Sequence, residues 1–561
     1  MKKLLLSVPL LFLFTSCVTG PMEGPLTPQT EQVPETGNYA GSMVEAVRII
    51  DPYSVENIMK LMEDEGMTRS GGSIVTPAVT HYHVRFKPTT DEQCDIIKND
   101  ETIDIQPYPF DVEVPLGAVS YVDYDQPVNT PAFIFAIVRK NYSFPQGVAY
   151  DILGSLCNLE SSAPAIANTL DLGTPSIDPI NPPRGMFECH TEASDIVGGS
   201  SGSTSGPFKP SGTIKVWDNL LEAYIPLAGV KVKAKRNALS SVIMTTDANG
   251  RFSTTKTYEG KVTYSIIWET GSYDIRDGKF GQAFYSGPTK KEPWNLKIDN
   301  SDSYKKTAHI ASIHRAAYRY YYGNVGGLLA GVKHTGNKKI KISYMNETGA
   351  SVFQSGHTVI PGIFPDIKIF KRRTGDTKDR TISEIYAATS HELGHLVHCL
   401  RMGNLSYWQV KKYIRESWAD FVQWHLLKLE YEERSASLGF NDANKFRILQ
   451  NIINNDEYSC QYWPYYDRNG KTESNTDYSP IFIDLVDDYN QQVANERNYG
   501  INSHCVYPND QVSKYTAATL NEIVLRTYNV SGLKSAVKNQ KPSNVTNVEI
   551  DNLFLRYEEI W

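Results

Sequence analysis

Hydrophobic and polar residues alternate in different ways along the chain, and each pattern predicts a different kind of structure. Residues 44–65 carry apolar side chains at helical spacing, whereas residues 80–86 alternate as a half-buried strand does. Residues 212–217, 229–235 and 262–268 also alternate, which predicts an all-β segment. Beyond residue 300 the helical spacing returns, and it predicts helices at 308–322, 381–402, 407–433, 479–490 and 517–528, with one short strand at 366–370.

Changes in composition divide these patterned segments into domains. A chain of 561 residues is too long for one hydrophobic core. Residues 195–211 are rich in Gly and Ser, which is typical of a flexible linker. We therefore predict a multidomain protein with an α+β domain of unknown role at 45–194, an all-β sandwich at 212–299 and a mainly helical α+β domain at 300–561.

The first residues have the composition of an export signal. Lys2 and Lys3 precede an apolar run at residues 4–14, which is too short to span a bilayer because a span needs roughly 20 apolar residues. Residues 1–16 are therefore predicted to be a signal peptide. The residues that end at Cys17 resemble a bacterial lipobox, which implies a lipid on the Cys17 thiol. An ordinary signal peptide with a chance cysteine is the alternative.

Lipidation would place the protein in the bacterial cell envelope. Residues 17–44 are rich in Pro, Gly and Thr, and we expect them to be a tether between the membrane and the first domain. The outer membrane is the expected location, with the periplasmic and the surface-facing orientation both open. The formal net charge of −7 gives no basic surface that would bind nucleic acid.

The remaining six cysteines are sparse and irregularly spaced, which is not typical of a disulfide framework. Cys460 and Cys505 are the first candidates for a disulfide pair.

The strongest chemical signal is the segment His-Glu-Leu-Gly-His at residues 391–395. In a helix, His391 and His395 lie one turn apart on the same face, so both rings can bind one Zn²⁺. Glu392 projects from nearly the same side and can reach a water at the metal. The segment therefore predicts a zinc site with Glu392 as a general base.

A catalytic zinc needs a third protein ligand and an open fourth position. One route to that ligand places a second Gly and a third His shortly after the motif, but the corresponding positions here are His398 and Arg401. The other route places a Glu on a second helix, and Glu416 follows His395 by 21 residues. Asp420 lies one helical turn after Glu416, where it can accept a hydrogen bond from a ligating histidine.

These residues and their spacing resemble the gluzincin family of zinc metallopeptidases, in which HExxH is followed by ExxxD. The resemblance implies His391, His395 and Glu416 as ligands of one Zn²⁺, Glu392 as the base that deprotonates the attacking water, and a peptide or protein as substrate. It also implies a Tyr or His that stabilises the oxyanion, and Tyr478 and His504 are the candidates.

Gluzincins hold their substrate along an edge strand of the sheet. The strand predicted at 366–370 lies upstream of the motif, where that edge strand is expected.

The all-β segment also resembles a known module. Ala-Gly-Val-Lys-Val at residues 228–232 and the turn from Thr246 to Phe252 resemble the carboxypeptidase-regulatory-like family, whose fold is a transthyretin-type or Ig-like sandwich. Together with a lipid anchor, this order of domains resembles exported lipoproteins of the Bacteroides type. The resemblance implies a spacer role for residues 212–299 and a zincin-like fold for residues 300–561.

Two other interpretations stay open. The protein can be a surface lipoprotein that binds a glycan or a protein and retains an idle zinc site. Such a site would not need Glu392, because only hydrolysis needs the base, so the presence of Glu392 favours an enzyme. A purely structural zinc is disfavoured because such sites fill all four positions, usually with Cys, and only Cys399 is nearby. His81 and His83 share one strand face, but with no third ligand we interpret them as ordinary strand residues.

Overall fold

The structure is a computed structural model of the whole chain, and it describes most of the residues from Ser42 onward. The described ranges are 42–64, 77–127, 130–159, 172, 176–189, 206–279, 281–301, 304–334, 338–354, 365–459, 461, 466–467, 477–499 and 505–561. The predicted signal peptide, Cys17, most of the tether and linker, Cys460 and His504 lie outside these ranges. No helix in the described part of the chain combines the length and the apolar character needed to cross a bilayer.

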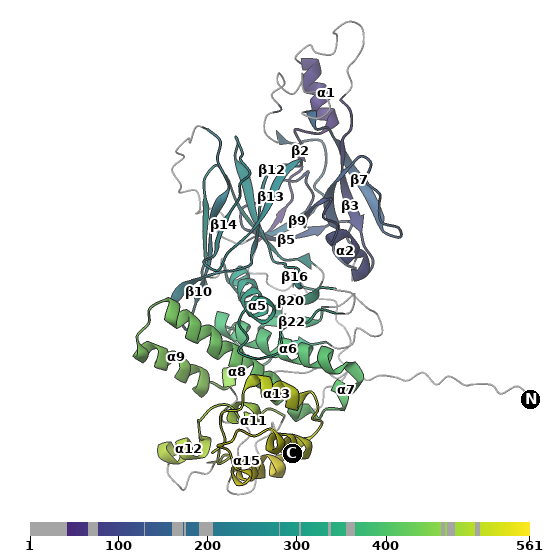
Figure 1. The fold of residues 1–561 in the computed structure, drawn as a ribbon. Coiled ribbons are helices and arrows are strands. Elements are labelled where there is room, and N and C mark those ends of the chain that lie inside the picture. The colour runs from purple at the N-terminus through teal and green to yellow at the C-terminus, as the bar shows by residue number, and fades with distance from the viewer. Residues whose placement is uncertain are drawn as a thin grey trace, which may run out of the picture.

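The chain combines helices with several mostly antiparallel sheets, and its parts follow one another from top to bottom in Figure 1. The N-terminal part contains a four-stranded sheet in the order β4-β6-β3-β7 and a three-stranded sheet in the order β1-β9-β5. Its helices are α1 (Val55–Asp64) and α2 (Asp91–Lys98). The strands of the two sheets are β4 (Asp104–Gln106), β6 (Ile134–Arg139), β3 (His81–Lys87), β7 (Ala149–Leu156), β1 (Ser42–Glu45), β9 (Gly185–Cys189) and β5 (Ala118–Asp123).

The strand predicted at 80–86 is confirmed as β3, but the helix predicted at 44–65 is only half right. The first half of that segment forms β1 and the two-residue strand β2 (Ile49–Ile50), and only the second half is the helix α1. β1 pairs with β9, and β2 pairs with β8 (Ser176–Ile177). These partners lie more than a hundred residues away, and their pairing outweighs the local helical spacing.

Two four-stranded sheets follow, and their inward side chains belong to one hydrophobic core. The first contains β11 (Ala223–Pro226), β10 (Ser211–Asp218), β14 (Arg251–Ser253) and β19 (Trp294–Ile298), and the second contains β13 (Ser240–Thr245), β12 (Lys231–Asn237), β15 (Val262–Ile267) and β18 (Phe284–Lys290). The three strands predicted here are confirmed. In the turn before β14, Asp247 accepts hydrogen bonds from the backbone N–H groups of Asn249 and Arg251, and Gly250 adopts a φ of +72°.

One sheet contains strands from both sides of the domain boundary that the sequence predicts between residues 299 and 300. β16 (Tyr273–Asp277) and β17 (Gly281–Gln282) leave the second sheet of the sandwich between β15 and β18. β16 then pairs in parallel with β20 (Ile340–Thr348), in a five-stranded sheet of order β17-β16-β20-β22-β21. The remaining strands are β22 (Ile367–Arg372) and β21 (Val352–Phe353). The sandwich and the helical part therefore share strands as well as a continuous core.

Three long helices pack beside this sheet: α5 (Lys305–Tyr322), α6 (Ile382–Met402) and α8 (Lys412–Ser437). A buried charge network joins them to the sandwich. Arg315 of α5 contacts Asp218 at the end of β10 at 3.0 Å and Glu430 of α8 at 3.2 Å. Because each buried charge has an oppositely charged partner, this network fixes the helices against the sandwich without leaving a charge unpaired.

Shorter helices complete the C-terminal half. They are α7 (Asn404–Gln409), α9 (Asp442–Asn454), α10 (Asp456–Ser459), α11 (Ile481–Asp484), α12 (Gln491–Tyr499), α13 (Ala517–Val524), α14 (Val530–Asn539) and α15 (Asn547–Ile560), with the two-stranded pair β23 (Tyr466–Asp467) and β24 (Cys505–Val506). The helix predicted at 407–433 is interrupted between α7 and α8, and the helix predicted at 479–490 is reduced to the single turn of α11. Cys94, Cys189 and Cys399 are buried free thiols, and Cys157 is buried as well.

Candidate metal centre

Helix α6 presents the histidines because its start is fixed and its contact with α8 is close. Thr381 and Glu384 form a capping box that satisfies free backbone N–H groups at the first turn. A Cβ at Gly394 would lie 3.1 Å from Cβ of Val422 and 3.2 Å from Cα of Ala419. Only a glycine therefore lets α8 approach α6 this closely without a shift of either helix.

This approach brings together His391 and His395 of α6 and Glu416 of α8, which we call the histidine cluster. The Nε2 atom of His395 lies 3.1 Å from Nε2 of His391 and 3.1 Å from Oε2 of Glu416. The third separation, from Nε2 of His391 to Oε2 of Glu416, is 3.5 Å. Neighbouring ligand atoms on a tetrahedral zinc lie about 3.3 Å apart, given zinc–ligand bonds of about 2.0–2.1 Å, so the cluster fits the ion.

The ligand atoms also have spare capacity for a metal. Glu416 is fully buried, yet its Oε1 atom has no hydrogen-bond partner among the described residues. Burial alone would raise the pKa of Glu416, but the two histidines hold it well below its usual value. Burial would lower the pKa of His391, but hydrogen bonds to Asp420 and Glu416 raise it to about 10. The cluster therefore keeps a carboxylate charged, and a metal that binds there displaces a proton from His391.

Each histidine is oriented by a second hydrogen bond. Nδ1 of His391 lies 3.0 Å from Oδ1 of Asp420, which is the contact that the sequence predicts for this carboxylate. Nδ1 of His395 lies 3.0 Å from the hydroxyl of Tyr407, in α7. Tyr407 was not predicted, because it belongs to a separate short helix and no spacing rule connects it to the motif.

Glu392 lies beside the cluster in a fully buried position. Neither of its carboxylate oxygens has hydrogen-bond geometry with a described group. Burial raises the pKa of Glu392 to about 8, while His391 and the nearby backbone of Phe353 act in the opposite direction. A bound cation would favour the ionised form of Glu392, and in that form the carboxylate could take a proton from a water molecule.

The edge strand expected at 366–370 requires a correction. The strand exists as β22, but it lies inside the sheet between β20 and β21. β21 is the terminal strand on this side, and it runs antiparallel to β22, with Val352 opposite Lys368 and Phe353 opposite Ile367. The chain turns back between β20 and β22, so the earlier segment takes the outer position next to Glu392.

Of the two oxyanion candidates, the structure describes one. The ring of Tyr478 lies 6.3 Å from the ring of His391, between centroids, so Tyr478 borders the cluster. His504 lies outside the described residues. Ser479, the next residue after Tyr478, places its Oγ atom 2.9 Å from Oγ of Ser417 in α8. This contact holds the segment around Tyr478 against the helix that carries Glu416.

His398 and Cys399 do not belong to the ligand group. The ring of His398 packs edge-on against Tyr407 and Trp418, and burial lowers the pKa of His398 to about 3. The thiol of Cys399 points to Oδ1 of Asn404 at 3.8 Å, and burial raises its pKa to about 12. Both side chains therefore stay in their neutral forms as parts of the core.

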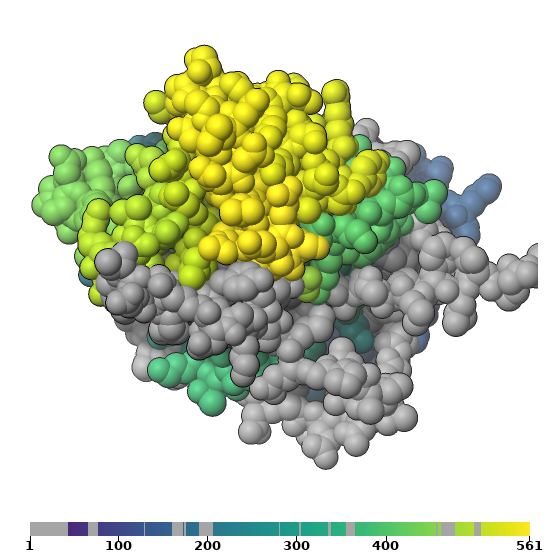
Figure 2. Space-filling model, turned by 90° about the horizontal axis from the view of Figure 1, so that it is seen from below, coloured from purple at the N-terminus to yellow at the C-terminus, as the bar shows by residue number. Residues whose placement is uncertain are grey.

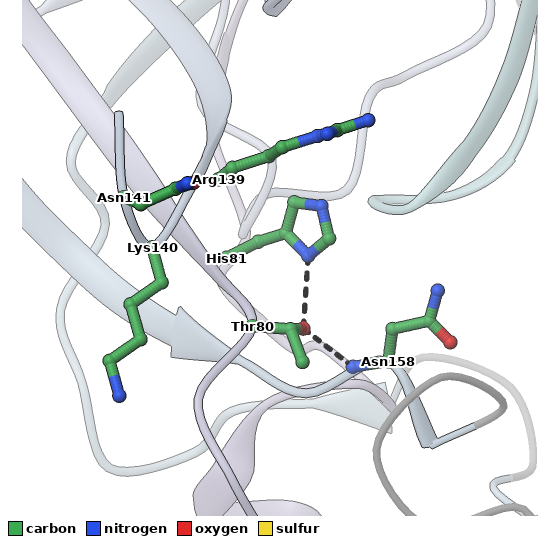
Figure 3. Close-up of a pocket in the computed structure, with 6 residues that line it drawn as sticks. All are labelled: Thr80, His81, Arg139, Lys140, Asn141 and Asn158. Carbon is green, nitrogen blue, oxygen red and sulfur yellow. Dashed lines mark hydrogen bonds between the residues drawn. The ribbon is translucent and has the colours of Figure 1, made fainter. Parts of the chain in front are cut away.

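His81 and His83 also have separate environments. His83 is buried, and its Nε2 atom accepts a hydrogen bond from the Phe110 backbone N–H at 3.2 Å. His81 lies in a shallow pocket of the N-terminal part (Figure 3), where its Nδ1 atom contacts Oγ1 of Thr80 at 2.9 Å. Neither histidine belongs to a group of metal-ligand side chains in the described part of the chain.

Comparison with known proteins adds no relative. No family model, curated protein or solved structure matches the chain. The functional interpretation therefore depends on the geometry of the site.

Proposed function

We propose that this chain is a zinc-dependent peptidase of the gluzincin type, which hydrolyses peptide bonds in a peptide or protein substrate. The observation that carries the proposal is the histidine cluster, with separations of 3.1 to 3.5 Å between its ligand atoms. Beside it lies the buried carboxylate of Glu392, which has no side-chain hydrogen-bond partner among the described residues. A structural zinc site has no use for such a base, whereas hydrolysis requires one.

The roles of the residues follow from their positions. Zinc held by the histidine cluster supplies a Lewis acid that polarises the scissile carbonyl and lowers the pKa of a water molecule. Glu392 accepts a proton from the attacking water and transfers it to the leaving amine. Asp420 and Tyr407 orient the rings of His391 and His395.

Substrate is proposed to bind along β21, the terminal strand beside Glu392. A peptide that adds to a strand edge is held by its backbone, so this mode gives affinity with little dependence on sequence. Tyr478, which borders the ring of His391, is the proposed donor to the oxyanion.

The other parts of the chain are assigned supporting roles. We propose that the two four-stranded sheets at 212–299 form a carboxypeptidase-regulatory-like sandwich and that the sheet and helices after residue 300 form a zincin-like catalytic domain. A lipid on Cys17 would hold the protein in the bacterial cell envelope. The histidine cluster belongs to α6 and α8, which lie below the N-terminal strands in Figure 1.

The decisive test combines metal content with hydrolysis. We expect about one zinc per chain by elemental analysis, and cleavage of casein or a peptide library by the purified protein. Glu392→Gln is expected to retain the zinc, because Glu392 is not a ligand, and to lose cleavage. Glu432→Gln is the matched control, since Glu432 is an exposed residue of α8.

The outcomes separate the interpretations. Zinc without cleavage of any peptide, in the native protein as in Glu392→Gln, would favour a binding lipoprotein with an idle site. A folded protein that takes up no zinc would exclude the mechanism.

A further inference from the structure

A second group of potential metal ligands lies at the C-terminal end of the molecule. Asp484 ends α11, Asp487 follows in the next turn, and Asp510 lies in the loop before α13. One carboxylate oxygen from each residue lies within 4.8 Å of the others. Asp484 is fully buried, Asp510 is 5% exposed and Asp487 is partly buried. We call these three residues the acidic cluster.

The negative charge of this cluster has no adjacent cation among the described residues. Asp484 accepts hydrogen bonds from the Tyr557 hydroxyl at 2.6 Å and from the Gln491 amide at 2.5 Å. Asp510 accepts one from the Val512 backbone N–H at 2.9 Å. These donors are all neutral. Lys428 lowers the pKa of Asp487 from a longer distance, but it does not act on Asp484 or Asp510.

Elsewhere the same protein surrounds a buried carboxylate with cations. Glu430 is also buried, and it contacts Arg315 at 3.2 Å, Arg319 at 2.6 Å and Arg434 at 3.0 Å. Burying a carboxylate without such partners costs several kcal/mol or forces it to take up a proton. The acidic cluster therefore lacks a positive charge that the fold provides at Glu430.

Two buried oxygen atoms at the cluster lack partners among the described residues. Oδ2 of Asp510 is one of them. The other is Oε1 of Gln491, whose side chain is fully buried. The Nε2 atom of the same carboxamide donates to Asp484 and to Oε1 of Gln461, so this buried side chain contacts the cluster through its nitrogen. Oδ2 of Asp510, a buried carboxylate oxygen that accepts no hydrogen bond from the described residues, is free to bind a cation.

We propose that the acidic cluster binds one hard divalent cation, and that Ca²⁺ is the ion its ligands select. The set consists of carboxylate oxygen atoms only, which is the ligand type of Ca²⁺. Zinc and other transition metals favour sites with His or Cys, and the cluster contains neither. Mg²⁺ keeps several of its waters, so it gains less from a buried set of carboxylates.

The position of the cluster gives the ion a structural role. Asp484 lies six residues after Tyr478, which borders the histidine cluster, and its contact with Tyr557 reaches α15. The C-terminal residues, yellow in Figure 2, form one continuous part of the surface on the lower side of the molecule. A cation here would hold α11, the loop at Asp510 and α15 in contact, and it would stabilise the position of Tyr478 beside the histidine cluster.

The test is a Ca²⁺ titration of the zinc-loaded protein after treatment with EGTA. We expect one Ca²⁺ per chain by calorimetry, and a rise in Tm of about 2 °C or more at a hundredfold excess over Kd. Asp510→Asn is expected to abolish both effects and to keep its zinc. Asp488→Asn is the matched control, because Asp488 is exposed and adjacent to the cluster in sequence. If Asp510→Asn does not fold, Asp487→Asn serves in its place, since Asp487 is only partly buried.

Two results would overturn the proposal. One is a folded, zinc-loaded protein that shows neither heat of binding nor a change in Tm with Ca²⁺. The other is an equal loss of the Ca²⁺ effect in Asp488→Asn and Asp510→Asn. An equal stabilisation by Mg²⁺ would overturn the choice of Ca²⁺. None of these readouts depends on hydrolysis, so they are independent of the proposed peptidase activity.

Discussion

The histidine cluster and the acidic cluster are both buried groups of metal-ligand side chains, but they balance charge in different ways. In the histidine cluster, Glu416 and Asp420 lie against two imidazoles, and the pKa of His391 is raised to about 10 by these carboxylates despite its burial. In the acidic cluster, the hydrogen-bond donors among the described residues are neutral. The first site therefore balances its carboxylates with its own imidazoles, whereas the second has no cationic side chain beside it in the described part of the chain.

This difference implies different tasks for the two sites. Nitrogen ligands and an adjacent base, Glu392, suit a zinc ion that takes part in chemistry. Oxygen ligands without an adjacent base suit an ion that contributes to stability. Removing one ion should therefore stop hydrolysis, and removing the other should mainly lower Tm.

The largest expected effect comes from removing a ligand of the histidine cluster. Glu416→Gln replaces a charged ligand with a neutral amide, and we expect loss of zinc and a fall in peptide hydrolysis of roughly 10³-fold or more. Elemental analysis and the rate of peptide cleavage measure the two effects. The rise in Tm with Ca²⁺ should persist in this variant, and its disappearance would mean that the two clusters are not separate sites. Glu432→Gln, on the exposed side of the same helix, should change neither.

A smaller effect is expected at the residue that orients His391. Asp420→Asn keeps the shape of the side chain but removes its charge, and we expect zinc affinity or activity to fall roughly 10- to 100-fold. Competition with a chromogenic chelator measures the affinity. An unchanged zinc affinity together with unchanged activity would show that the contact of 3.0 Å between Asp420 and His391 has no functional role.

The two clusters also differ in how far the sequence reveals them. His391 and His395 are one helical turn apart, and a helix of known period is enough to place them together. Asp484 and Asp510 come from a one-turn helix and a loop, so no periodic pattern connects them. Their burial depends on Tyr557 and on other parts of the C-terminal segment, which local sequence does not specify.

The same reasoning explains which parts of the fold could be predicted. Helix α6 follows from its capping box and its spacing, and β10, β12 and β15 follow from alternation. Alternation does not tell which sheet a strand joins, so β16 was placed in the sandwich although it pairs with β20. For the same reason, the sequence predicts residues 366–370 at the edge of the sheet, although β21 holds that position.

A hydrogen bond that involves no charged side chain should matter less than Asp420. Tyr407→Phe removes the hydroxyl that contacts Nδ1 of His395 at 3.0 Å. One such hydrogen bond contributes about 1 kcal/mol, so we expect a fall of roughly fivefold in zinc affinity or in kcat/KM. Tyr413→Phe is the control, because its hydroxyl accepts a hydrogen bond from the Val530 N–H in α14. Equal losses in the two variants would indicate a general packing effect instead of a contact at His395.

The last expected effect concerns folding stability alone and leaves zinc affinity and hydrolysis unchanged. His314 of α5 is buried, with its ring nitrogens on the Tyr273 hydroxyl and the Ala228 carbonyl, and burial lowers its pKa to about 4. In the unfolded chain the pKa of a histidine is about 6.5, so below that pH the unfolded state binds the proton first. The contribution of His314 to stability is therefore complete above pH 6.5 and is lost as the pH falls towards 4.

At pH 5 this loss amounts to about 2 kcal/mol, which is a shift of about 2 °C in Tm for a chain of this size. His314→Gln should flatten the dependence of Tm on pH between 6.5 and 4, measured with both metals removed, whatever its effect on Tm at pH 7.5. An unchanged slope would show that His314 has the same pKa in the folded and in the unfolded protein. Any dependence on pH that remains after this correction, and that disappears with Ca²⁺ or zinc, then belongs to the metal sites themselves, because metal ligands must lose their protons before they bind.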